Sequence, residues 1–301
     1  MSALVDWIEK PGFYPGMSAD RYFADPCPTP SLRQSAIPEL AGINARSPLH
    51  FALKHPRLNP YGREGTSSRA QFLGSAVHRL ALGAGRDVSV IRYPDYKSPT
   101  ARAARDLAIA NGRIPVLERE HVRALDMAAI LRDAIEDELG GAPYQTEVPF
   151  FWIEQTAAGP VWCAGMLDVW CESLGIALDP KTTSGAATRE AFGKDAAANG
   201  YDLQGEWYPR GIGKLRPELQ GHVRFRNLVV ETAEPFGFRS MQPSESTRYI
   251  ASRQCDQALE LFGQCLHGRS WPSYPREVEV YSTPSYYQNA IMARESGEEL
   301  P

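Results

Sequence analysis

Two aspartates and a lysine are spaced so that one β-hairpin would bring them together. The sequence around them reads WCAGMLDVWCESLGIALDPK and contains Asp168, Asp179 and Lys181. A hairpin that turns at Ser173–Leu174, or a four-residue loop over 172–175, pairs Asp168 directly with Asp179. Because side chains alternate along a strand, Lys181 lies on the same face as Asp179. We therefore expect two carboxylates and an amine on one side of a sheet.

This arrangement places like charges opposite each other, which destabilises a sheet. A hard divalent cation with oxygen ligands would offset the repulsion, and Lys181 alone could offset part of it. The same spacing also fits a surface hairpin whose exposed face simply happens to be charged. The opposite face carries apolar residues that are expected to reach the core, namely Leu167, Val169, Ile176 and Leu178.

Pro180 stands between the second acid and the lysine. Proline cannot donate a hydrogen bond to a strand ladder, so the strand is expected to lie at an edge or to bend here. A bend at an edge would suit a site that a large ligand must approach.

Two further pairs could support such a site. Gly74 and His78 are four residues apart on a predicted helix and share one face, where the glycine would allow a backbone or ligand to come close. A lone helical histidine is more often structural than catalytic. Gln204 and Tyr208 lie one helical turn apart and could hydrogen-bond a phosphate or a base, although alone this pair is weak evidence. Glu147, on the preceding strand, fits a structural role as well as a chemical one.

The elements that must position these residues follow an α/β pattern. We expect a mixed central sheet flanked by helices, with a helical N-terminal portion. Residues 1–46 are interpreted as an irregular or helical arm, 47–270 as the main domain and 271–301 as a loosely ordered tail. Helices are predicted at about 18–23, 48–54, 67–83, 100–111, 117–139, 187–199, 202–211 and 246–266, and strands at 145–154, 161–171, 176–181, 223–232 and 236–241.

The charge distribution leaves the class of partner open. A net charge of -4 over 301 residues argues weakly against nucleic acid. One stretch is nevertheless basic, opposed only by Glu64, and could form a phosphate-contacting surface or simply a solvated face. Its basic residues are Arg46, Lys54, Arg57, Arg63, Arg69, Arg79 and Arg86.

The compartment is expected to be the cytoplasm, with no membrane partner. No leader peptide and no apolar stretch long enough to span a bilayer is visible. Five dispersed cysteines without a CxxC pair indicate reduced thiols and argue against a zinc ribbon. Cys163 and Cys171 fall on an apolar strand face, which favours a packing role.

The order of these motifs resembles the RecB-like branch of the PD-(D/E)xK nucleases. That order is His78, then Asp168, then Asp179-x-Lys181, then Gln204-x-x-x-Tyr208. The contexts FLGSAVH and DPKTT, with the later hairpin LVVETAEPFG, look most like the RecE (exodeoxyribonuclease VIII) subgroup of phages and prophages. The resemblance covers about 47–266 and implies a restriction-endonuclease-like core. Each motif alone is unspecific, but four in order are fairly specific.

The resemblance implies a role for each matching residue. Asp168, Asp179 and the backbone carbonyl of Pro180 would ligate Mg2+ or Mn2+. His78 would ligate a second ion or contact the scissile phosphate. Lys181 would orient or help deprotonate the attacking water. DNA would be positioned by Gln204 and Tyr208, and we add Arg69 and Arg79 from the basic stretch as candidate DNA contacts.

The implied activity is a metal-dependent DNA exonuclease that acts on double-stranded ends in recombination. Family precedent suggests 5′ to 3′ polarity, a ring-like homo-oligomer and an accompanying single-strand annealing protein. Alternatives are a structure-specific or single-strand nuclease on the same scaffold, or a catalytically inactive DNA-binding protein. Cluster-containing RecB-like nucleases carry three closely spaced cysteines after the core, whereas here only Cys255 and Cys265 follow, so we predict no iron–sulfur cluster.

Overall fold

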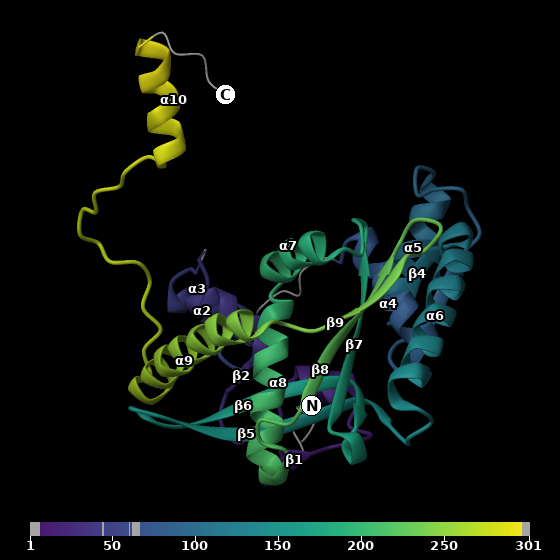
Figure 1. The fold of residues 1–301 in the computed structure, drawn as a ribbon, viewed down its shortest axis with the longest axis horizontal. Helices are drawn as coiled ribbons and strands as arrows, with labels where there is room; N and C mark the ends of the chain where they lie inside the picture. The colour runs from purple at the N-terminus through teal and green to yellow at the C-terminus, as the bar shows by residue number, and fades with distance from the viewer. Residues whose placement is uncertain (1–6, 44, 60, 62–66, 297–301) are drawn as a thin grey trace.

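A mixed central sheet organises the chain. The computed structural model describes residues 7–43, 45–59, 61 and 67–296. The strand order is β1-β5-β6-β7-β8-β9, with β2 paired to β6 beside this path (Figure 1). The strands are β1 (Gly12–Phe13), β2 (Ser31–Arg33), β5 (Gln145–Thr156), β6 (Gly159–Cys171), β7 (Ile176–Thr183), β8 (Arg224–Glu231) and β9 (Phe238–Met241).

The predicted hairpin is the β6–β7 pair. Its antiparallel ladder runs from Cys171↔Ile176 to Val169↔Leu178, so the next step along both strands places Asp168 opposite Asp179. The turn is the four-residue loop, with a short 3-10 helix over Glu172–Leu174 and Gly175 at φ 61°. The expected register is therefore confirmed, and glycine at the left-handed position closes the loop without a Cβ clash.

Helices cover both faces of the sheet (Figure 1). On one face, α4 (Arg69–Leu82) and α6 (Glu118–Leu139) pack against β6, β7 and β8 through side chains such as Val169 and Leu178. On the other, α8 (Tyr201–Leu215) and α9 (Glu245–Gly268) enclose a core that includes Trp152 and Trp207. The predicted class, a mixed sheet flanked by helices, is confirmed.

The helix that carries His78 has strong end signals. Ser68 and Gln71 form a reciprocal capping box at its start, and Gly83 ends it at φ 68°. Helix α8 extends beyond the predicted end at Gly211 to Leu215, because Ile212 is fully buried in the core and holds the added turn.

Several elements were not predicted. A separate two-stranded parallel sheet joins β3 (Val88–Ile91) to β4 (Ile114–Leu117), with α5 (Pro99–Ala110) between them in the chain. Strands of two to four residues are too short to show alternation in a sequence. Helices α2 (Ile37–Ala41) and α10 (Ser285–Ser296) were not predicted either, whereas α1 (Ala19–Phe23), α3 (Pro48–Lys54), α5 and α7 (Arg189–Asn199) agree with predicted helices.

The two terminal regions differ in how they join the core. The N-terminal region supplies β1 and β2 to the sheet, and Leu32 and Ile37 are fully buried. At the other end, Trp271 packs against Phe51 and Phe262. Helix α10 lies further along the tail and stands apart from the other helices in Figure 1.

The cysteine thiols are not joined in disulfides. All five cysteines are buried and free, and Cys163 and Cys171 lie in the two main cores. Within the described ranges, none of the helices is both long and apolar enough to cross a bilayer.

Candidate active site

The site lies where β6 and β7 separate. Beyond Leu178, β7 is paired only with β8, and this singly paired stretch contains Asp179, Pro180 and Lys181. Pro180 thus lies on a local edge, where its missing N–H leaves no ladder bond unmade. We call the opening between these strands the fork.

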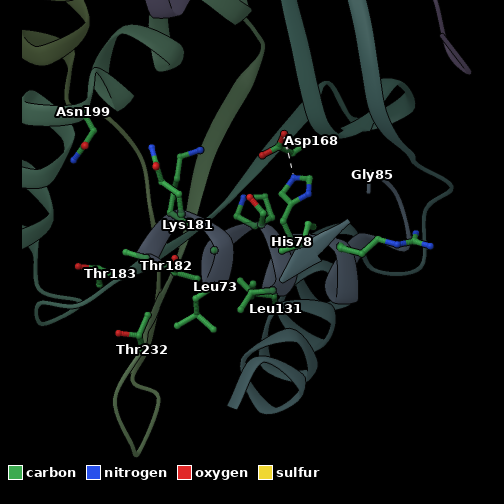
Figure 2. A pocket seen from close by; sticks show the side chains of 18 of the residues that line it. Leu73, His78, Gly85, Leu131, Asp168, Lys181, Thr182, Thr183, Asn199 and Thr232 are labelled. Atoms are coloured by element: carbon green, nitrogen blue, oxygen red, sulfur yellow. Dashed lines mark ion pairs between the residues drawn. The ribbon is translucent and has the colours of Figure 1, made fainter. Parts of the chain in front are cut away.

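Helix α4 closes one side of the fork. A Cβ added at Gly74 would lie 3.1 Å from Thr182 Oγ1, so glycine allows the helix to approach β7 closely. One turn further along α4, His78 reaches Asp168 on β6, and Figure 2 marks this ion pair with a dashed line. Gly74 and His78 therefore share one helical face, as predicted, and the glycine allows the close packing of α4 on β7 that brings His78 to Asp168.

Asp179 is held by two nitrogen donors. Lys181 Nζ lies 2.5 Å from its Oδ2, and Asn227 Nδ2 on the adjacent β8 donates to the same oxygen at 3.0 Å. Asp179 is 2% exposed, so its charge is balanced by these neighbours rather than by bulk water.

Asp168 and His78 form a second charged group with Glu147. His78 Nε2 lies 3.3 Å from Asp168 Oδ1, and its Nδ1 lies 3.7 Å from Glu147 Oε1. Both ring nitrogens of the histidine therefore face carboxylates, which fixes the orientation of the ring.

Glu147 was left out of the predicted catalytic set, yet it lines the same site. The β5–β6 register, with Thr146↔Val169 and Val148↔Leu167 on either side, places Glu147 opposite Asp168. Its backbone is left-handed, at φ 47°, a conformation that costs a non-glycine residue about 1–3 kcal/mol. The sequence offered Glu147 as a candidate acid, and extending the hairpin register argument to β5 would have placed it opposite Asp168.

The electrostatics of these groups are coupled. Burial, opposed by Lys181 and reinforced by Asp168, raises the pKa of Asp179 to about 6. Burial acts to raise the pKa of Asp168, but the His78 imidazolium and Lys181 lower it below its ordinary value. Burial acts to lower the pKa of His78, and the carboxylates of Asp168 and Glu147 outweigh it and raise that pKa. The two aspartates thus differ in how readily they take up a proton.

Lys181 also contacts an aromatic ring. Its Nζ lies 4.8 Å from the centroid of Tyr201, and Tyr201 stacks on Phe192 with centroids 6.1 Å apart. Burial acts to lower the pKa of Lys181, but Asp179 and Asp168 raise it, so the side chain is an ammonium group. The ring and the carboxylate together restrict where this ammonium can point.

The fork opens into a groove of about 740 Å³. Figure 2 shows that Asp168, His78 and Lys181 project into it from β6, α4 and β7. The groove extends from α1 to Asn199 at the end of α7, and its charged lining residues are His78, Arg79, Arg86, Glu147, Asp168, Lys181 and Asp195.

Gln204 and Tyr208 lie behind the site rather than in the groove. Tyr208 is 7% exposed, and its ring packs edge-on against Phe150 and Phe225. Gln204 Nε2 donates to the Tyr208 hydroxyl at 3.4 Å, and neither residue lines the groove. Because Tyr208 is enclosed by the core, the Gln204–Tyr208 pair is better placed to support the carboxylates of the site from behind than to contact DNA directly.

The predicted arginine contacts are largely neutralised. Arg69 Nε lies 2.5 Å from Glu120 and does not line the groove, whereas Arg79 does line it and also pairs with Asp87 at 2.9 Å. Arg86 lines the groove as well. Arg63 lies outside the described residues. Three other basic residues of the stretch do not line the groove: Arg46, Lys54 and Arg57.

The donor set fits a hard divalent cation. Asp179 is buried, Asp168 is partly exposed in the groove, and the repulsion between the two carboxylates contributes to the raised pKa of Asp179. Such oxygen pairs are typical ligands of Mg2+. In the described part of the chain, no three His, Cys, Asp or Glu side chains converge as a preformed metal cluster. Instead Asp179 faces Lys181 and Asp168 faces His78, so ion binding would require these carboxylates to exchange partners.

Comparison with known proteins identifies a shared fold. No family model and no curated protein matches the sequence. A provisionally named exonuclease from Eubacterium rectale, solved by crystallography, aligns over 91% of this chain and 97% of its own, with a TM-score of 0.57 and 13% identity. The two proteins share a fold. A second solved structure, SSO0001, aligns over 65% of this chain and 87% of its own at 13% identity, but its TM-score of 0.27 carries no argument.

Proposed function

We propose that this protein is a metal-dependent nuclease that hydrolyses phosphodiester bonds in DNA. The observation that supports this most directly is the fork, where Asp168 and Lys181 line an open groove and the buried Asp179 contacts Lys181. The motif order resembles that of RecE-like nucleases, and the fold is that of a protein provisionally named an exonuclease. The first two lines of support share Asp168, Asp179 and Lys181, and the likeness in fold adds a comparison that extends over 91% of the chain.

Different residues of the site bind the metal ion and orient the reactants. Asp168, Asp179 and the Pro180 carbonyl would hold Mg2+ or Mn2+, which when bound would act as a Lewis acid on the phosphate and acidify a water molecule. His78 would ligate a second ion once it has released its proton, or contact the scissile phosphate as an imidazolium. Lys181, as an ammonium, donates hydrogen bonds that orient a water or a phosphate oxygen in the groove. These positioned charges stabilise the negative charge that develops on the phosphate.

The resemblance supports a more specific substrate. We propose exonuclease activity on double-stranded DNA ends in recombination, with 5′ to 3′ polarity. A homo-oligomer and a single-strand annealing partner are part of this proposal and rest on the same resemblance.

Digestion of linear, nicked and covalently closed plasmid tests the proposal. We expect the wild type to degrade only the linear form with Mg2+, and EDTA or Asp179→Ala to abolish degradation. Asp126→Ala removes an exposed acid that does not line the groove and serves as the matched control. Cutting of closed circles would indicate an endonuclease. Intact DNA binding with no cleavage of any form would instead support an inactive binding protein.

Lys181→Ala tests the site assignment itself. Because the lysine acts on the reacting water or phosphate, we expect this change to abolish cleavage and to spare DNA binding in a filter-binding assay. Cleavage that survives the substitution would show that the fork is not the catalytic centre.

A further inference from the structure

An exposed aromatic side chain lines the groove at a distance along the chain from the catalytic motifs. Phe23 is the last residue of α1 and is 52% exposed, although it lines the same groove as His78 and Asp168. Its neighbour Tyr22, by contrast, is 5% exposed and packs on Phe151. Single exposed aromatic rings are common on protein surfaces, but this one lines the groove that also holds the charged site.

The ring is held in place by its surroundings. Tyr22 meets it edge-on with centroids 5.2 Å apart, and the Arg33 guanidinium carbon lies 5.6 Å from its centroid. The loop that follows α1 is tied by Asp25, which accepts hydrogen bonds from the Ser31 backbone N–H and hydroxyl at 3.1 and 2.5 Å. A ring braced in this way loses little conformational entropy when a ligand stacks on it.

The ring is also linked to the reactive carboxylates through the sheet. Tyr22 packs in a small core with Met166, which lines the groove beside Phe23. Met166 and Asp168 are two residues apart on β6, so they share one face of the strand. A strand of nucleic acid bound at Asp168 therefore has Phe23 within the same groove.

We propose that Phe23 is a stacking platform for an unpaired base of the DNA strand that enters the groove. This inference rests on the proposed nuclease function. Stacking on an aromatic side chain requires a free base face, and inside a duplex both faces are covered by neighbouring base pairs. Arg86 lines the same groove and supplies a cation for the adjacent backbone, whereas Arg79 is already paired with Asp87. The ligand is thus single-stranded DNA or the frayed end of a duplex.

Binding to a single-stranded deoxyoligonucleotide that carries one 2-aminopurine tests the proposal. The parent is Lys181→Ala, which prevents cleavage, and the tested changes in it are Phe23→Ala, Phe23→Leu and Phe23→Trp. We expect Ala and Leu to weaken binding at least about 10-fold and to remove the quenching that stacking causes, and Trp to retain both. Leu keeps the apolar bulk, so a change shared by Ala and Leu is not a loss of packing. Tyr249→Ala removes an exposed tyrosine of α9 outside the groove and should change neither signal.

The outcomes separate this inference from the proposed function. If the parent binds the oligonucleotide and wild type cleaves DNA, but Phe23→Ala and Phe23→Leu bind and quench like the parent, the stacking role is wrong and the nuclease proposal stands. If the parent does not bind and wild type does not cleave, the nuclease proposal fails and the stacking inference fails with it.

Discussion

Lys181 has two neighbours that limit where its ammonium group can point. Asp179 accepts from it at 2.5 Å, and the Tyr201 ring lies 4.8 Å from it, braced by Phe192. The carboxylate must be released if it binds a metal ion, whereas the ring can remain in contact. Tyr201 is therefore expected to keep the lysine in position during turnover.

Two substitutions of Tyr201 distinguish the contribution of its ring from that of its hydroxyl group. A cation–π contact contributes about 0.5–2 kcal/mol, so we expect Tyr201→Leu to lower kcat about 10-fold with little change in KM for DNA. Tyr201→Phe retains the ring and should retain the rate. Steady-state cleavage kinetics measure both constants, and an equal loss of kcat in the two variants would assign the effect to the hydroxyl instead.

Glu147 is held in an unusual backbone conformation beside the candidate site. Its left-handed φ of 47° interrupts the regular alternation of β5 opposite Asp168. Such a conformation persists only where the surroundings hold it, and here the side chain faces His78 while Gly85 leaves space for its carboxylate. The sequence indicates an acid at this position but not the direction in which it points.

At the scale of elements, the close contact of α4 with β7 sets the position of His78. Only 3.1 Å would separate a Cβ at Gly74 from Thr182 Oγ1, and His78 lies one turn further along the helix. A larger residue at Gly74 would push the helix away from the strand, and the histidine would move from Asp168 with it.

Gly74→Val should therefore reduce both stability and activity. Overpacking of this kind costs about 1–3 kcal/mol, and we expect urea unfolding to show a loss of that size together with slower DNA cleavage. Thr182→Ala in the same chain should restore part of both. Gly193→Val places the same residue in α7, where nothing lies within 4 Å, and controls for helix propensity. Equal effects at the two glycines would rule out the contact as the cause.

A buried acid joins β5 to α8. Glu154 is 3% exposed and lies 2.8 Å from Arg210 Nε, and Arg210 also pairs with Asp256 of α9 at 2.6 Å. Burial acts to raise the pKa of Glu154, but Arg210 and Lys214 outweigh it and lower that pKa below its ordinary value. A lowered folded-state pKa stabilises the fold above the unfolded pKa, and this stabilisation is lost as pH falls through the folded value.

Glu154→Gln should weaken the fold at neutral pH and reduce its sensitivity to acid. Removing one partner of a buried ion pair costs about 3–5 kcal/mol, so we expect a loss near that range at pH 7. Below pH ~4.5, the stability of the variant should fall less steeply than that of the wild type. Chemical denaturation at a series of pH values measures both effects, and parallel pH profiles for the two proteins would contradict this role for Glu154.

At the scale of the whole molecule, the site gathers elements that are far apart in the chain. His78, Glu147, Asp168 and Asp179 come from α4, β5, β6 and β7, so an ion bound among them would join both halves of the fold. The total charge of -4 says little about this site, because the groove brings together basic residues (Arg79, Arg86 and Lys181) and acidic ones (Glu147, Asp168 and Asp195).

Mg2+ should therefore stabilise the folded protein. A ligand at about 100 times its Kd adds about 2.7 kcal/mol, which corresponds to an increase in Tm of roughly 4 °C for a chain of this size. EDTA should reverse the increase, and Asp179→Asn should abolish it. Differential scanning calorimetry with and without Mg2+ measures the shift, and an unchanged shift in Asp179→Asn would place the ion elsewhere.

The local part of the site could be predicted from the sequence. Asp168, Asp179 and Lys181 lie on one hairpin, and the period of two along a strand fixes their common face once the loop length is known. The capping residues Ser68 and Gly83 likewise set the ends of the helix that carries His78. These features depend on residues close together in the chain, so composition and spacing determine them.

Which side chains reach the groove depends on contacts between distant parts of the chain, so only the tertiary structure decided it. Tyr208 has the spacing of a DNA-binding residue but is enclosed between Phe150 and Phe225, and Phe23 has no motif yet lines the groove. Whether a side chain faces solvent or core depends on which elements pack over it, and those elements are tens to hundreds of residues away. The sequence by itself determined which groups could react, and packing determined which of them reach the groove, because burial is a property of the assembled sheet and helices rather than of any one segment.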